Sequence, residues 1–116
     1  MFLDDPLTIE RHQGNLPGTR ILRLTGPLTL RNLFTLQDEL RGGDPPLVAI
    51  LDLTGVPYMD SAGMGALINY FVHCEKNGIE MIVAGVSQRG LELFKMTKVD
   101  TVIPLADTVE EAEARA

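Results

Sequence analysis

The residues best able to do chemistry stand close together near the middle of the chain. Asp52 and Thr54 close an apolar run, and Asp60 and Ser61 follow a few residues later, just ahead of Gly63. The N–H groups of a helix's first turn lack partners and the helix dipole there favours negative charge, so a serine at that place can carry a phosphate. A phosphate on Ser61 would add roughly two negative charges beside Asp60. Such a change in charge would suit a switch at Ser61, and a plain helix N-cap is the alternative.

Catalysis is not expected from these residues. A serine nucleophile needs a base within hydrogen-bond reach. His73 lies on the same expected helix as Ser61, roughly 18 Å away at about 1.5 Å per residue, and His12 belongs to an N-terminal hairpin. One cysteine, Cys74, and two separated histidines do not make a zinc site. We therefore expect no enzyme, no metal and no cofactor, with both histidines at the surface and Cys74 as a buried structural thiol.

The glycines and aspartates also have simpler explanations. Gly63 and Gly65 are not followed by the lysine of a phosphate-binding loop, and their spacing does not match a dinucleotide fingerprint, so close helix packing is the better account. Asp60 is equally suited to be a helix cap or a solvated turn residue. Asp52, at the end of a strand, is expected to hydrogen-bond local backbone.

Strands and helices alternate along the chain. We expect strands at 7–10, 19–25, 47–53, 79–84 and 101–103, and helices at 30–41, from Ser61 to about 77, after an N-cap at Ser87, and from a capping box at 107–110. The turn formers at 14–18 join the first two strands as a hairpin. This order predicts one α/β domain over 1–116, with a mixed, mostly parallel sheet and about four helices.

These elements place Ser61 at a characteristic position. The run 47–53 is apolar on both alternating faces, as in a central strand covered on two sides. Functional residues in open α/β sheets gather beyond the carboxyl ends of such strands. The next helix is expected to bury one apolar face, made of Met64, Leu67, Ile68, Phe71 and Val72. Tyr58, Met59 and Met64 surround Ser61 and form either a contact surface or core.

Composition narrows the possible partners. Acidic residues outnumber Lys and Arg by 16 to 10, giving a formal net charge of −6. Nucleic-acid binding and attachment to anionic membranes both need basic surfaces, so neither is expected. No apolar run approaches the roughly 20 residues that cross a bilayer. The start, 1–5, is acidic where a secretory signal is basic, so we expect a cytoplasmic protein.

The central motif resembles that of a known family. Asp52-Leu53-Thr54, followed by 58–65 (Tyr-Met-Asp-Ser-Ala-Gly-Met-Gly), looks like the core motif of bacterial anti-sigma factor antagonists, the STAS domains. Arg23-Leu24-Thr25-Gly26 resembles the end of the family's second strand, and Leu93-Phe94 with Val99 and Ile103 resembles its late helix and final strand. The resemblance covers most of the chain and implies a single STAS-like domain.

The family also implies roles for individual residues. Ser61 matches the serine that an anti-sigma factor with serine kinase activity phosphorylates; the unphosphorylated domain binds that kinase, and a serine phosphatase restores binding. Asp60 would present Ser61 to the kinase. The implied partner-binding residues are Tyr58, Met59, Asp60, Ser61, Ala62, Gly63 and Met64, with Asp52, Thr54 and Gly65 in support.

One departure from the family keeps other functions open. The strand-ending glycine is followed by Pro27-Leu28-Thr29, where the family commonly has Glu-Leu-Asp with the aspartate near the switch serine. A STAS-type adaptor in a transporter or sensory complex, working without phosphorylation, is therefore one alternative. A nucleotide or small-molecule binding module at the strand-end edge is the other.

Overall fold

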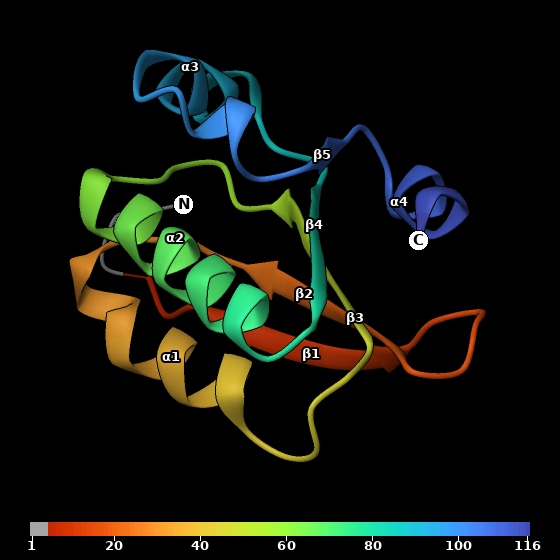
Figure 1. Cartoon of the computed structure of the whole chain (residues 1–116). Coiled ribbons are helices and arrows are strands. Elements are labelled where there is room, and N and C mark those ends of the chain that lie inside the picture. Colours follow the sequence, from red (N-terminus) through yellow and green to blue (C-terminus); the bar gives the residue numbers. More distant parts are fainter. Residues whose placement is uncertain (1–4) are drawn as a thin grey trace.

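The computed structural model describes residues 5–116. The first four residues of the acidic start, on which the expectation about secretion was based, lie outside the described residues. Strands and helices alternate after an initial hairpin, and the sheet carries helices on both faces (Figure 1). The expected α/β architecture with a mixed sheet is confirmed.

The sheet has five strands in the order β1-β2-β3-β4-β5. Its members are β1 (Thr8–Gln13), β2 (Thr19–Thr25), β3 (Val48–Gly55), β4 (Glu80–Ala84) and β5 (Leu105–Ala106). β1 pairs with β2 antiparallel, and all other pairs are parallel. The hairpin therefore supplies the one antiparallel edge, and β1 extends three residues beyond the predicted strand.

Helices cover the two faces unequally. The helical segments are a 3-10 turn η1 (Leu30–Asn32), α1 (Leu33–Arg41), α2 (Ser61–Lys76), α3 (Gln88–Met96), a second 3-10 turn η2 (Val99–Thr101) and α4 (Val109–Arg115). α1 and α2 lie side by side against one face, while α4 lies on the other (Figure 1). The large core cluster contains residues of α1, α2 and α3, and a smaller cluster forms under α4.

β2 and β3 both carry buried side chains on the two faces of the sheet. In β2, Leu22 and Leu24 enter the large cluster, whereas Ile21 belongs to the small cluster under α4. β3 is buried on both faces from Ala49 to Leu53. This double burial follows from the apolar run 47–51, and it fixes the strand whose end leads to Ser61.

The predicted last strand at 101–103 is wrong. Lys98 adopts a left-handed conformation with φ of 61° after α3, and the chain continues into η2. The N–H groups of Val102 and Ile103 both donate to the Val99 carbonyl, so these groups are not available to a sheet. Ile103 is buried in the core instead, and the short strand β5 forms two residues later.

The N-caps of α3 and α4 lie at or within one residue of their predicted positions. Ser87 caps α3 by accepting a hydrogen bond from Gly90 N at 3.1 Å, as predicted. The cap of α4 lies one residue beyond the predicted start: Thr108 Oγ1 accepts from Glu111 N at 3.1 Å.

The buried face of α2 differs in part from the prediction. Met64 and Leu67 are buried, but Ile68 and Val72 are 38% and 43% exposed. The residues that face the core are Gly63, Met64, Ala66, Leu67, Tyr70 and Cys74. Cys74 is fully buried, which agrees with a structural thiol. Because α2 carries more apolar residues than one face can bury, an apolar stripe stays on its outer side.

Candidate partner-binding site

Ser61 is the first residue of α2, and its side chain is exposed. The residue before it, Asp60, is extended and forms the N-cap: Asp60 Oδ1 accepts from Gly63 N at 2.8 Å. The alternative that Ser61 itself caps the helix is therefore wrong. Among the hydrogen bonds of residues 5–116, none uses the Ser61 hydroxyl, which leaves this oxygen open to modification.

Asp60 also ties α2 to the segment before α1. Its second carboxylate oxygen, Oδ2, accepts from Leu30 N at 3.3 Å. One side chain thus holds the first turn of α2 and the 3-10 turn η1 together. These two hydrogen bonds fix the orientation of Ser61 at the protein surface. The contact with Leu30 joins residues thirty positions apart, so sequence spacing could not predict it.

The loop before Ser61 is hydrogen-bonded to Leu28 through an isolated parallel β-bridge. Leu28 N donates to Tyr58 O at 3.0 Å, and Asp60 N donates to Leu28 O at 3.1 Å. Gly63 lies against the same residue, since a Cβ on it would overlap the Leu28 carbonyl oxygen. Close packing, predicted for both glycines, is thus found at Gly63. It is wrong for Gly65, which is exposed and whose Cβ would have no neighbour within 4 Å.

The structure separates the predicted contact residues, together with the predicted supporting residue Gly65, into three groups. Gly63 and Met64 are buried, so they support the site from below and cannot touch a partner in this conformation. Tyr58, Met59, Asp60 and Ala62 are half-buried, and Met59 packs against the core. Tyr58 lies under the Arg89 guanidinium, 5.9 Å from the ring centre. Ser61 and Gly65 are the exposed members.

An exposed apolar stripe continues from Ser61 along α2. Ser61, Gly65, Ile68 and Val72 are spaced four, three and four residues apart, and this spacing places them on one side of a helix. Leu30, bonded to Asp60, is 64% exposed and Phe34, one turn further on, is 78% exposed. We call these six residues the docking face. Sequence reasoning missed its apolar members because it assigned Ile68 and Val72 to the core.

Thr29 stands where the family commonly has an aspartate, and it is buried next to this face. Its side chain is 6% exposed, and its hydroxyl oxygen has no hydrogen-bond partner within residues 5–116. The neighbouring Leu30 N is the group bonded to Asp60. A buried carboxylate at position 29 would therefore lie near Asp60, and threonine places no second negative charge there.

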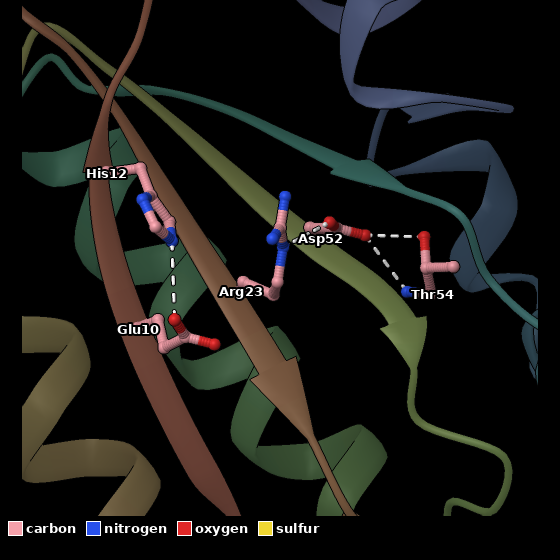
Figure 2. A network of polar contacts seen from close by, with 5 residues as sticks. All are labelled: Glu10, His12, Arg23, Asp52 and Thr54. Atoms are coloured by element: carbon pink, nitrogen blue, oxygen red, sulfur yellow. Dashed lines mark hydrogen bonds and ion pairs between the residues drawn. The ribbon is translucent and has the colours of Figure 1, made fainter.

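Asp52 and Thr54 do not join the Ser61 surface. Asp52 lies on the α4 side of β3 and accepts hydrogen bonds from Thr54 N at 3.0 Å, Thr54 Oγ1 at 2.6 Å and Arg23 Nε at 3.2 Å (Figure 2). Burial alone would raise the pKa of the Asp52 carboxyl, but the hydrogen bonds from Thr54 and the Arg23 guanidinium together lower it below its ordinary value. The local backbone role predicted for Asp52 is confirmed.

This network makes stability depend on pH. Because the folded-state pKa of Asp52 is depressed, its contribution is present above the unfolded value of 3.8 and is lost as pH falls through the folded pKa. As the pH falls from about 6 to about 3, the free energy of unfolding of the wild type should decrease by about 1 kcal/mol more than that of Asp52→Asn. The expected difference is modest because Arg23 is half exposed and its charge is screened by solvent. Urea unfolding at the two pH values measures it. Identical pH profiles would contradict the assignment.

Removing the Asp60 cap should loosen the start of α2. Asp60→Ala is expected to lower the free energy of unfolding by about 1–2 kcal/mol, because Gly63 N and Leu30 N both lose their acceptor. Asp60→Asn keeps one acceptor oxygen and should cost less. Asp38→Ala, at an exposed acid of α1, is the matched control for charge removal. Equal stability of Asp60→Ala and the control would show that the cap is not needed.

The groove under α4 bears on the nucleotide alternative. It encloses about 630 Å³, and its charged lining consists of Arg23 and four carboxylates, from Asp52, Asp107, Glu110 and Glu113. An anionic ligand would meet this excess of negative charge. The groove at the strand-end edge is therefore poorly suited to a nucleotide.

Within residues 5–116, no three His, Cys, Asp or Glu side chains lie close enough together to bind a metal ion. Nor does this region include a helix with the length and apolar character needed to cross a membrane.

Comparison with known proteins places the chain among two kinds of relatives. Over 65 residues it is 32% identical to an anti-sigma-B factor antagonist of Listeria monocytogenes, a match that covers 56% of this chain and 57% of that protein. Over 125 residues it is 33% identical to mouse solute carrier family 26 member 10, covering 96% of this chain but 18% of the carrier. The chain thus spans a little over half the length of the first relative and a small part of the second.

Solved structures agree on the fold. The chain is similar to a putative anti-sigma factor antagonist from Thermotoga maritima, with a TM-score of 0.81, 17% identity and 92% of both chains covered. It is also similar to the Bacillus cell fate determinant SpoIIAA in its phosphorylated form, with a TM-score of 0.69, 19% identity, and 93% and 98% covered. The model of the STAS domain family matches residues 8–112. These residues are nearly the whole chain, and the protein belongs to the STAS domain family.

Proposed function

We propose that this STAS domain is an anti-sigma factor antagonist that binds an anti-sigma factor through the docking face and is switched off by phosphorylation of Ser61. The observation that carries the proposal is the position of Ser61. Its hydroxyl, which makes no hydrogen bond within residues 5–116, is exposed at the start of α2, at one end of a stripe of exposed apolar side chains. The partner would itself be the serine kinase, and a serine phosphatase would restore binding.

The physical effect of a phosphate at this place is large. Gly63 N is already occupied by Asp60, so a phosphate on Ser61 would have the N–H groups of Ser61 and Ala62 as its nearest backbone donors. It would bring roughly two negative charges next to the Asp60 carboxylate. A partner that closed over Ile68 and its neighbours would remove water from these charges without neutralising them. The phosphorylated face should therefore release its partner.

The relatives support this proposal from two sides. The Listeria protein is an anti-sigma-B factor antagonist, and SpoIIAA, whose fold is similar, has a phosphorylated form. Neither histidine could activate Ser61 as a nucleophile: His73 is near the other end of α2 and His12 is on β1. The proposed role is therefore binding, without catalysis or a cofactor, in the cytoplasm.

Variants at Ser61 test the switch. Against an anti-sigma factor kinase from the same genome, Ser61→Asp is expected to weaken binding by at least about 30-fold, because it places a second carboxylate beside Asp60 in a closing interface. Ser61→Ala removes only a hydroxyl that makes no hydrogen bond within the described residues and should bind as the wild type does. Isothermal titration calorimetry measures both. Equal affinities for the two variants would contradict the proposal.

Phosphorylation itself can be tested by intact-mass analysis. The protein is mixed with ATP and an extract of its host, with Ser61→Ala in parallel. A gain of one phosphoryl group by the wild type alone supports the switch. If the extract phosphorylates other substrates but leaves this chain unchanged, Ser61 is not its target.

A second candidate is an adaptor domain in a transporter or sensory complex that does not use phosphorylation. The match to the mouse solute carrier, which covers nearly all of this chain, favours it, as does Thr29 in place of the family's usual acid. An adaptor would co-purify with a membrane or multi-subunit complex, whereas the antagonist would co-purify with a soluble kinase.

A further inference from the structure

A second recess lies at the end of α2 remote from Ser61. It encloses about 180 Å³ between the last turns of α1 and α2, the loop that leads into β3, and the start of β2. At roughly 30 Å³ per water molecule, this volume holds about six waters. The recess is therefore of the size of a small ion or the head of a small metabolite.

The charged groups that line this recess are basic. Arg20, Arg41 and His73 contribute to its wall, together with the amide side chain of Asn77. No acidic side chain of residues 5–116 lines it, although the chain carries a net charge of −6. This local excess of hydrogen-bond donors is the opposite of the acidic groove under α4. The lining suits an anion.

Structural contacts account for only part of this basic lining. Arg20 donates one N–H to the Asp44 carbonyl at 2.6 Å, which leaves four of its five donors for other partners. Arg41 makes no hydrogen bond or ion pair with any residue of the described chain, and its side chain is exposed. Arg11, by contrast, lies outside the recess. It forms an ion pair with the Glu39 carboxylate and donates hydrogen bonds to the backbone carbonyls of Glu39 and Gly42. Arg41 lies in the last turn of α1, where its charge is favourable to the helix dipole, but it has no ion-pair partner among residues 5–116.

The walls of the recess are stiff. Pro45 and Pro46 fix the loop on one side. Tyr70, which is buried, stacks on the His73 ring with 6.0 Å between ring centres, and Asn77 Nδ2 donates to the His73 carbonyl at 2.8 Å. A ligand would find these groups already in place, which reduces the entropy lost on binding.

The helix dipoles disfavour an anion in the recess, but their effect is smaller than that of the two arginine charges. α1 and α2 both end at the recess, and each C-terminus carries about half a negative charge. Together they amount to roughly one negative charge, against the two full positive charges of Arg20 and Arg41. The local balance stays positive.

We propose that this recess binds a small oxyanion with a phosphate-type head, either inorganic phosphate or the phosphate of a small metabolite. The planar, multi-donor guanidinium groups of Arg20 and Arg41 match the oxygens of such a head. Because α2 has 16 residues, at about 1.5 Å each, the site lies roughly 24 Å from Ser61 along the helix.

An NMR titration of the ¹⁵N-labelled protein with sodium phosphate, at ionic strength held constant with sodium chloride, tests the site. The expected result is saturable shifts of the Gly42, Gly43 and Asn77 amides, with a dissociation constant on the order of 1 mM. Glycerol phosphate, titrated in the same way, separates the two sources. Tighter binding of the ester identifies a metabolite phosphate, and equal or weaker binding identifies inorganic phosphate.

Variants show whether the recess is responsible. Arg41→Gln should weaken binding about tenfold or more, and since Arg41 makes no hydrogen bond or ion pair within residues 5–116, this variant should remain folded. Arg31→Gln, at an exposed arginine of η1, should bind like the wild type. Ser61→Ala should also bind like the wild type, which keeps this test separate from that of the switch. Shifts that never saturate, or equal affinity of Arg41→Gln and the wild type, would overturn the proposal.

Discussion

Gly63→Ala is expected to lower the free energy of unfolding by on the order of 3 kcal/mol, at the upper end of overpacking effects. An alanine Cβ at this position would overlap the carbonyl oxygen of Leu28 and come within 2.9 Å of its side chain. That carbonyl cannot move away freely, since it accepts the hydrogen bond from Asp60 N at 3.1 Å. The substitution would push the first turn of α2 away from residue 28 and disturb the position of Ser61.

Gly65→Ala provides the matched control two residues further along the same helix. A Cβ at Gly65 meets nothing within 4 Å, so the added methyl group only restricts the unfolded chain and favours helix. This variant should be more stable than the wild type by about 0.5–1 kcal/mol. Urea denaturation of the two variants measures the difference. If Gly63→Ala were as stable as Gly65→Ala, the close approach of α2 to Leu28 would be incorrect.

The contrast between these glycines shows what a sequence can predict about such a site. Gly63 and Gly65 stand in the same motif, on the same helix, and neither has a left-handed backbone. What distinguishes them is Leu28, more than thirty residues earlier in the chain. Local periodicity predicts that α2 exists and where it begins, but the partner of each face is decided by tertiary packing.

Tertiary packing also explains why the sequence-based predictions were wrong for the strand at 101–103 and for the buried face of α2. The helical stripe 63–67–70–74 and the stripe 61–65–68–72 both carry apolar residues, and only the position of the sheet decides which of them is buried. At 101–103 the β-branched residues suggested a strand, but the left-handed turn at Lys98 places them in a tight turn. Double burial of β3 was predictable because the continuous apolar run 47–51 admits few other structures.

Ile68→Glu is expected to weaken binding of the anti-sigma factor by about 30-fold or more, if the docking face is the contact surface. Ile68 is 38% exposed, midway between Gly65 and Val72 on the outer side of α2. An apolar side chain near the centre of an interface typically contributes on the order of 2 kcal/mol or more, and a carboxylate there would be desolvated without a cationic partner. Stability should change little, because a half-exposed position lets the new side chain reach water.

Leu16→Glu is the control that separates a specific surface from general loss of hydrophobicity. Leu16 is 53% exposed in the turn between β1 and β2, away from α2, and its replacement adds the same charge to the same net −6 protein. Titration calorimetry with the same partner should give wild-type affinity for this variant. A loss in Ile68→Glu alone would place the partner on α2.

Phe34→Glu then measures how far the contact surface extends. Phe34 is the most exposed apolar side chain of the docking face, at 78%, and it lies on α1, one turn beyond the residue that Asp60 holds. If the partner spans both helices, Phe34→Glu should weaken binding as strongly as Ile68→Glu does, because both side chains would then lie under the same closed surface. Wild-type affinity of both variants would exclude the docking face, and the surface around Tyr58 and Arg89 would be the next to test.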